Sequence, residues 1–314
     1  MSAALSERQC TALPDELRGA LREASPELLR VLRTLNDLRS GRPGLREALR
    51  ELDPRGAGLS RARELGLLEG SDERPAPTEL GAAVFDGVKQ YWNWLKRRDE
   101  LPRGVTAEMV AGRRVLDVGC GVGCSLMTFA RHGARALVGV DVMPVFVELG
   151  RVFAEREGAP TPELHLCDAA RMPLRDASCG FVFSRIALNY MRADRVIAEM
   201  ARVASDGADL ALCVNGLPWS LRALGRAVRG LRFRRAAFFS FSLLNGAVYN
   251  TLGTQLTLRH AGAMHASHSP VFLTARKLRR ELRQAGCSAA AQVIRAGDTL
   301  TVLARRSPRD EVAP

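Results

Sequence analysis

The sequence lacks any apolar run of the roughly 18–20 residues that a membrane-spanning helix requires, so we expect no transmembrane segment. Its first ten residues do not join a basic stretch to an apolar one, which gives the expectation of no signal peptide. Both observations lead us to expect a cytoplasmic protein. With 314 residues, the chain is long enough for one large domain or two small ones.

The sequence also lacks clustered cysteines. Its seven cysteines are scattered, and several fall inside expected buried strands. Cys120 and Cys124 are four residues apart, but the third and fourth ligands of a zinc site are missing nearby. We therefore expect free thiols in a reducing compartment, and we predict no metal site.

Acidic residues are scarce in the last third of the chain. Residues 215–314 hold 16 basic and 4 acidic side chains, whereas residues 1–100 hold 17 of each and residues 101–214 hold 13 of each. The formal net charge of +12 therefore resides entirely in the last hundred residues. The N-terminal third has no basic excess of the kind that DNA binding requires.

What the sequence does contain is a glycine-rich stretch, around which the rest can be interpreted. Val115 to Val118 form a short apolar run that includes Asp117, and Gly119, Gly121 and Gly123 follow at every second position. A strand that turns through glycines into a helix lets the backbone approach a nucleotide cofactor closely. The spacing differs from the Gly-x-Gly-x-x-Gly of dinucleotide folds, and a pyrophosphate disfavours an acid so near. A cofactor with an ammonium group would instead find its charge partner in Asp117.

This stretch resembles the glycine-rich motif of the class I S-adenosylmethionine-dependent methyltransferases. Strand-like runs follow at 136–141, 164–168, 181–184 and 208–214, with helical segments between them, the clearest at 193–204. Repeated strand–helix units of this length build a parallel sheet that binds ligands at the carboxyl ends of its strands. A hairpin at 291–303 should add an antiparallel strand. We expect an α/β fold, a Rossmann-like doubly wound sheet with an antiparallel C-terminal hairpin strand.

The resemblance covers about residues 113–214 and implies a cofactor site for S-adenosylmethionine, whose product is S-adenosylhomocysteine. By matching motif, Asp141 should bind the ribose and Asp117 with the three glycines should surround the methionine part. The resemblance also implies cofactor contacts at three strand ends. Met143, Asp168 and Ala169 should contact the adenine, and Ser184 and Arg185 should line the methyl-donor side.

Residues 1–98 are predicted to form a separate, mainly helical domain, followed by the methyltransferase domain at 99–314. Helices should begin at the caps Ser25 and Thr78, and a polar turn near Ser71 suggests a winged-helix-like module. Such a module could dimerise and help to close the substrate site, which the balanced charge favours, or it could bind DNA. Trp94 lies just before the second domain and could pack at the junction or line a substrate lid.

Residues 215–270 form a long insert after the fifth expected strand. The insert is rich in arginine and aromatic residues, and no acid occurs from there until Glu281. Insertions here in the family shape the acceptor pocket, so we expect an apolar and anionic acceptor, or one bound to a carrier protein. A membrane-touching helix is an alternative, as is a solvated helix that packs its apolar side on the domain. Phe241 and Tyr249 are the candidate substrate contacts of the insert.

Methyl transfer depends on orientation, and a protonated oxygen or nitrogen acceptor also needs a base. The candidates for the base are His260, His265 and His268 in the insert, with Tyr190 after the fourth strand. Asn189 and Tyr190 are also candidate acceptor-binding residues, or simply helix-start packing. A small-molecule methyltransferase of specialised metabolism is the predicted function. The alternatives are an RNA or protein methyltransferase, although no Asn-Pro-Pro-Tyr-like tetrapeptide follows Ser184, and a non-catalytic cofactor-sensing regulator.

Overall fold

The computed structural model describes residues 13–40, 44–71, 74–256, 270–288 and 292–308. Its centre is a seven-stranded sheet with the order β5-β4-β3-β6-β7-β9-β8. Neighbouring strands run parallel from β5 through β7, and β9 pairs antiparallel with both β7 and β8. The predicted α/β class and the antiparallel C-terminal hairpin are therefore confirmed. The strands are β3 (Arg114–Val118), β4 (Ala136–Asp141), β5 (Glu163–Leu166), β6 (Cys179–Arg185), β7 (Ala204–Asn215), β8 (Gln292–Ala296) and β9 (Thr299–Arg305).

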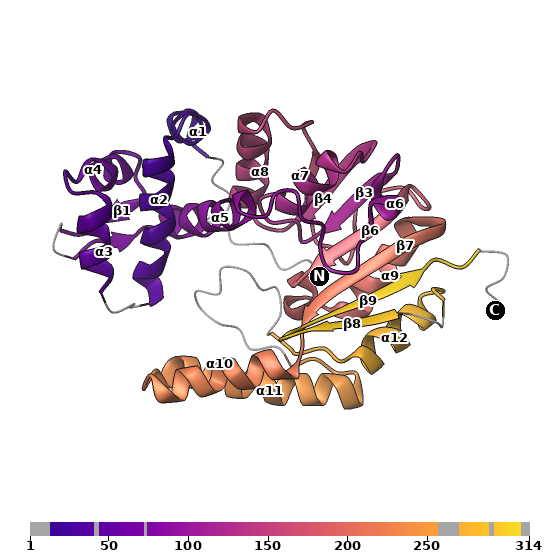
Figure 1. The fold of residues 1–314 in the computed structure, drawn as a ribbon. Helices are drawn as coiled ribbons and strands as arrows, with labels where there is room; N and C mark the ends of the chain where they lie inside the picture. Colours follow the sequence, from indigo (N-terminus) through magenta and orange to yellow (C-terminus); the bar gives the residue numbers. More distant parts are fainter. Residues whose placement is uncertain (1–12, 41–43, 72–73, 257–269, 289–291, 309–314) are drawn as a thin grey trace.

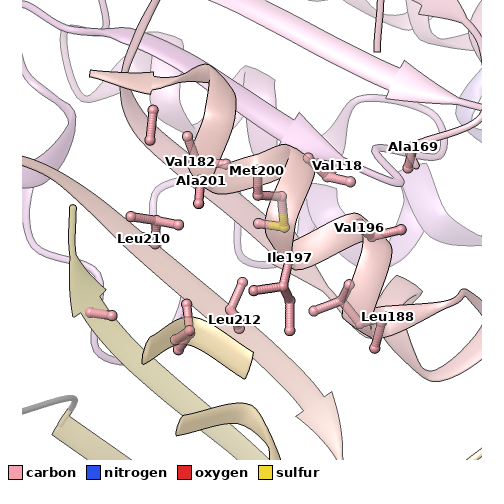
Figure 2. Packing of buried hydrophobic residues seen from close by; sticks show 14 of the residues in the cluster. Val118, Ala169, Val182, Leu188, Val196, Ile197, Met200, Ala201, Leu210 and Leu212 are labelled. Atoms are coloured by element: carbon pink, nitrogen blue, oxygen red, sulfur yellow. The ribbon is translucent and has the colours of Figure 1, made fainter. Parts of the chain in front are cut away.

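Helices cover both faces of this sheet, as the alternating strand–helix pattern requires. On one face, side chains of the strands such as Val118, Val182 and Leu212 pack against Ile197 and Met200 (Figure 2). On the other face, Phe181 and Phe183 meet Phe129 edge-on. The elements concerned are α6 (Ala107–Val110), α7 (Cys124–Arg131), α8 (Pro144–Arg156), η3 (Ala187–Tyr190), α9 (Ala193–Val203) and α12 (Ala275–Gln284).

The N-terminal segment is helical, with one short antiparallel hairpin, and it stands beside α7 and α8 (Figure 1). Its elements are α1 (Asp15–Arg22), α2 (Pro26–Leu35), η2 (Asn36–Ser40), α3 (Leu45–Leu52), α4 (Ala57–Glu64), β1 (Leu68–Glu69), β2 (Ala76–Pro77) and α5 (Glu79–Leu95). The Ser25 hydroxyl accepts from the Leu28 N–H at 3.1 Å and the Thr78 hydroxyl from the Gly81 N–H at 3.0 Å, so both predicted caps are confirmed.

The N-terminal helices share a hydrophobic core with the sheet domain. Leu17 and Leu21 of α1 belong to the same buried cluster as Phe153 of α8, and Tyr91 of α5 stacks on Phe153 with ring centroids 4.2 Å apart. Helix α5 therefore connects the two parts through packing as well as through the chain. The division of the chain at residue 98 and the winged-helix assignment stay predictions.

In the described part of the insert after β7, two helices run side by side, α10 (Leu217–Arg229) and α11 (Phe233–Leu252) (Figure 1). Trp219 of α10 meets Phe239 of α11 edge-on, with ring centroids 5.7 Å apart. No helix in the described ranges is long and apolar enough to cross a membrane.

Candidate cofactor and acceptor site

The glycine loop between β3 and α7 is the centre of the site. Gly119 has a φ of +72° and Gly121 a φ of +55°, both in the left-handed region that disfavours side chains. A Cβ on Gly119 would lie 2.2 Å from the Cβ of Ala187, and one on Gly121 would lie 2.6 Å from Oε1 of Gln90. Glycine is thus required here for backbone conformation and for close approach by two other segments.

Asp117 lies just below this loop with only 2% of its surface exposed. Its Oδ1 is buried and has no hydrogen-bond partner. Burial raises the pKa of the Asp117 carboxyl to about 7, and the negative charge of Asp141 acts in the same direction, whereas Arg185 and Ser125 oppose the rise. A buried carboxylate oxygen without a donor is costly, and a ligand ammonium group would satisfy it. Asp117 therefore fits the amino-acid end of S-adenosylmethionine.

Asp141 ends β4 and holds the glycine loop in place. Its Oδ2 accepts from the Gly121 N–H at 2.8 Å, and its Oδ1 accepts from the Met143 N–H at 2.9 Å. A carboxylate oxygen can accept more than one hydrogen bond, so each oxygen keeps capacity for a ribose hydroxyl. The fixed loop and the half-buried carboxylate are compatible with the ribose-binding role that the resemblance implies.

The residues implied at the adenine lie around the end of the neighbouring strand β5. The Cys167 N–H donates to the Asp141 carbonyl at 3.0 Å, which brings this strand end beside Asp141. Asp168 is exposed and accepts from the Ala170 N–H at 2.9 Å, Ala169 is buried, and Met143 is half-buried at the start of α8. The structure brings all three predicted residues to the same edge of the sheet, and their contacts with adenine stay a prediction.

Ser184 and Arg185 end β6, on the other side of β3. The buried Ser184 hydroxyl donates to the Val118 carbonyl at 2.8 Å and so ties the two strand ends together. Arg185 is exposed and lowers the pKa of Asp117 through its positive charge. The next residue, Ile186, has a φ of +67°, which is strained for a β-branched side chain and is typical of functional sites.

Sequence reasoning missed the contribution of helix α5, which lies against the glycine loop. Gln90 reaches Gly121, and its Nε2 donates to Oδ2 of Asp86 at 3.1 Å. Burial raises the pKa of Tyr190, and the negative charge of Asp86 adds to this effect, which places the two groups within electrostatic range of each other. The signal in the sequence was a polar pair at positions i and i+4 on an otherwise mainly buried helix.

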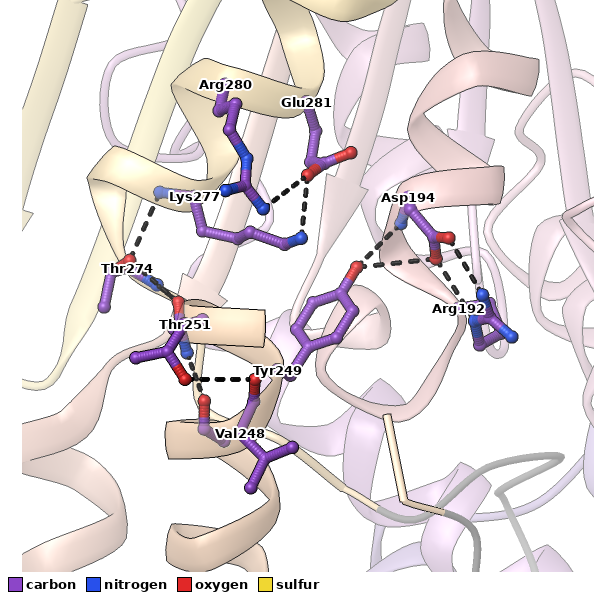
Figure 3. A network of polar contacts seen from close by, with 11 residues as sticks. Arg192, Asp194, Val248, Tyr249, Thr251, Thr274, Lys277, Arg280 and Glu281 are labelled. Atoms are coloured by element: carbon purple, nitrogen blue, oxygen red, sulfur yellow. Dashed lines mark hydrogen bonds and ion pairs between the residues drawn. The ribbon is translucent and has the colours of Figure 1, made fainter. Parts of the chain in front are cut away.

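The polar groups of two other predicted acceptor contacts already form hydrogen bonds within the protein. The Asn189 side chain donates to the Asn215 and Val271 carbonyls and accepts from the Asn215 N–H, at 2.8–2.9 Å. The fully buried Tyr249 accepts from the Asp194 N–H at 2.9 Å (Figure 3). Both residues join segments around the site, and their predicted contacts with an acceptor remain untested.

The remaining predicted residues are Trp94, Phe241 and three histidines. Trp94 is buried between α5 and α7, where its indole N–H donates to the Thr128 hydroxyl at 2.9 Å. Phe241 is half-buried on α11. The three predicted base candidates, His260, His265 and His268, fall outside the described residues. Within the described ranges, no group of three or more histidine, cysteine or acidic side chains could hold a metal ion.

The central part of the chain is similar to known methyltransferases. Residues 116–212 match the family model described as "Methyltransferase domain". Methyltransferase GfsG of Streptomyces halstedii is 34% identical over 107 residues, which cover 33% of this chain and 38% of that protein. Demethylmenaquinone methyltransferase of Thermobifida fusca is 31% identical over 144 residues, covering 42% and 59%. An S-adenosyl-L-methionine-dependent Diels-Alderase of Talaromyces variabilis is 32% identical over 122 residues, covering 38% and 41%. The matched segments thus span between two fifths and three fifths of these relatives.

Similar solved structures include an S-adenosylmethionine-dependent methyltransferase from Methanosarcina mazei, with 18% identity, 66% of this chain and 99% of that chain covered, and a TM-score of 0.48. Magnesium protoporphyrin IX methyltransferase from Synechocystis, with bound S-adenosylhomocysteine, has 17% identity, 83% and 100% coverage, and a TM-score of 0.44. No functional statement follows from similarity at this level. Residues 116–212 therefore resemble a methyltransferase domain, and the glycine loop and the acids at the strand ends lie where the resemblance to the class I, S-adenosylmethionine-dependent type implies them.

Proposed function

We propose that this protein transfers a methyl group from S-adenosylmethionine to a small, apolar acceptor that is anionic or carrier-bound. The observation that carries the proposal is the buried and unpartnered Oδ1 of Asp117 at the start of the glycine loop. In a domain of this family, that oxygen is suited to hold the ammonium group of the cofactor, while Asp141 binds its ribose.

We further propose that helix α5 closes the acceptor side of the site. When bound, the cofactor supplies an electrophilic methyl carbon next to a positively charged sulfur. Gln90 of α5 reaches Gly121 of the glycine loop and donates a hydrogen bond to Asp86, and the charge of Asp86 acts on Tyr190, which follows β6. The Asp86 carboxylate is in a position to accept the proton that an oxygen or nitrogen acceptor loses, and the packed helix excludes water from the reacting groups.

Binding of the cofactor is tested first by calorimetric titration with S-adenosylmethionine and S-adenosylhomocysteine. We expect micromolar binding by the wild type and loss of binding by Asp141→Ala. Asp206→Ala is the matched control, because it removes an exposed acid at the amino end of β7, away from the glycine loop. A folded wild-type protein that binds neither compound would contradict the proposal.

Turnover is tested by the release of S-adenosylhomocysteine in the presence of apolar carboxylic acids, supplied free or as thioesters. Asp86→Asn should lower kcat at least tenfold and leave the affinity for the cofactor unchanged, whereas Asn93→Ala on the exposed side of α5 should change neither. If Asp86→Asn retains full kcat, Asp86 is not the base, and His260, His265 and His268 become the residues to substitute.

A second candidate function follows from the relative named as a cofactor-dependent Diels-Alderase. A protein of that kind would bind S-adenosylmethionine and convert an unsaturated apolar substrate without releasing S-adenosylhomocysteine. Substrate conversion with no consumption of the cofactor would favour it. Co-purification of RNA, or sequence-selective binding of duplex DNA by the N-terminal helices, would instead favour the nucleic-acid and regulator alternatives.

A further inference from the structure

The α10–α11 hairpin carries an unusual concentration of exposed apolar side chains. Ten large apolar side chains are exposed in the described part of the chain, and all but Leu166 lie between Leu217 and Leu256. Single exposed apolar residues are normal on protein surfaces, but a concentration on one element indicates an interaction surface. The hairpin lies along the lower edge of the molecule (Figure 1).

The turn between the two helices, residues 228–235, which we call the hairpin tip, holds Phe233, the most exposed of these side chains. Val228 is 56% exposed, Leu231 75% and Phe233 79%. Leu231 also has a φ of +50°, a conformation that glycine or asparagine normally supplies at such a turn. Leu231 is both strained and exposed to solvent, so its side chain contributes nothing to folding. An interaction with a partner outside the chain explains it best.

The tip is also strongly basic. The exposed arginines are Arg229, Arg234 and Arg235 in the tip and Arg226 just before it on α10. None of them has an acidic partner in the described ranges. Residues 215–256 contain no acidic residue. Arg222, nearly two helical turns before the tip, is the exception among the arginines of α10, since it pairs with Asp298. The tip therefore presents apolar side chains surrounded by uncompensated positive charge.

An anionic lipid surface fits these features better than a protein partner does. A second copy of the chain would bring the same arginines together, and like charges oppose such contact. An acidic protein would need a pocket shaped for three protruding side chains, whereas a fluid bilayer interface accommodates them without one. Apolar residues beside arginines are the pattern of helices that lie in the headgroup region. No helix in the described ranges is long and apolar enough to cross the bilayer, so the hairpin would rest on its surface.

We propose that the α10–α11 hairpin docks the protein on an anionic membrane. Val228, Leu231 and Phe233 enter the interface, and the four exposed arginines bind lipid phosphates. Docking requires neither the cofactor nor turnover, so it stands or falls independently of methyl transfer. Helix α10 begins two residues after the end of β7, so the hairpin joins the sheet at the edge that holds the candidate site.

The test is co-sedimentation of the full chain with vesicles of phosphatidylcholine alone or mixed with phosphatidylglycerol. We expect binding only to the mixed vesicles, weakened by salt. Arg234→Gln with Arg235→Gln should weaken binding about 25-fold, at about fivefold for each arginine. Leu231→Gly with Phe233→Ser should weaken it at least tenfold, and glycine suits the turn, so this variant should fold. Leu166→Ser, which removes an exposed leucine elsewhere, is the matched control and should bind like the wild type.

Several outcomes would overturn the proposal. Equal binding to both vesicle types would remove the role of the arginines, and absence of binding by the wild type would remove docking altogether. Sedimentation velocity without lipid adds one more such outcome: a dimer that the Leu231→Gly and Phe233→Ser variant dissociates, without vesicle binding, would make the tip an interface between two copies. Binding of an acyl carrier protein that the same variant loses, again without vesicle binding, would make it a protein-docking site.

Discussion

Two regions of the molecule adjoin the same edge of the sheet and differ in almost every property. The strand-end region holds Asp117, Asp141 and Asp168 beside a glycine loop that the surrounding segments contact closely. The α10–α11 hairpin begins at Leu217, just past the residues that match the methyltransferase family model, and it holds arginines and bare apolar side chains instead. The residues that match the family model therefore hold the glycine loop and the strand-end acids, whereas the insert lies outside the match and carries the arginines and the exposed apolar side chains.

The largest expected effect that separates the regions comes from Asp117→Asn. Loss of the carboxylate should weaken the binding of S-adenosylmethionine at least 100-fold, because the charge partner of the ammonium group disappears. The same change should raise the free energy of unfolding of the cofactor-free protein at pH 8, on the order of 1–3 kcal/mol, since an ionised carboxylate is no longer buried. Calorimetric titration and chemical denaturation measure the two effects. A variant that binds normally would remove Asp117 from the site.

Glu281→Ala tests how the hairpin is anchored. Lys277 is 4% exposed, pairs with Glu281 at 2.8 Å and lies 4.3 Å above the ring of Tyr249 on α11 (Figure 3). Without Glu281, the buried ammonium group has lost its charge partner, and the free energy of unfolding should fall by about 3 kcal/mol. Urea denaturation measures this change, with Arg283→Ala at the end of the same helix as control. An unchanged free energy of unfolding would show that the Lys277 ammonium group either reaches water or loses its proton.

The pH dependence of cofactor binding should report on the strand-end region alone. The folded pKa of Asp117 is raised to about 7 from an ordinary value of 3.8, so the cofactor-free protein binds a proton there as the pH falls below 7. Affinity for S-adenosylmethionine should then decrease up to tenfold per pH unit below 7 and level off above it. By the same linkage, the contribution of Asp117 to the free energy of unfolding of the cofactor-free protein decreases as the pH rises from 3.8 to 7. A flat affinity between pH 6 and pH 8, measured by titration in matched ionic strength, would contradict the assignment.

The smallest effect is expected from Leu231→Gly at the hairpin tip. Relief of the left-handed strain should exceed the extra chain entropy of glycine and raise the free energy of unfolding by about 0.5–1 kcal/mol. Thermal unfolding measures the gain, and binding of S-adenosylmethionine should not change. Destabilisation would mean that Leu231 packs within the fold, which would weaken the case for docking.

Local signals in the sequence were sufficient to predict the helices and strands, and to predict the edge of the sheet that holds the candidate cofactor site. The spacing of apolar residues located all five parallel strands, and Ser25 and Thr78 begin helices as their types predict. The order of glycines and acids at successive strand ends predicted which residues would meet. These features were predictable because they depend on neighbours in the chain and on the rule that parallel strands end at one edge.

Only the tertiary structure decided what covers that edge and what is left bare. Gln90 contacts Gly121 across 31 positions of sequence, and nothing local to either residue encodes that contact. Asn189 has an amide side chain and Tyr249 a phenol, and either could equally have faced a substrate. Instead, each forms hydrogen bonds in the interior with segments that are distant in the sequence. The exposed side of α10 and α11 was likewise hidden in the sequence, because apolar residues on nearly every side of a helix do not reveal which of them find partners. The sequence by itself therefore determined the strands, the glycine loop and the acids, whereas packing between distant segments determined the position of α5 against the glycine loop, the buried polar network and the exposed hairpin tip.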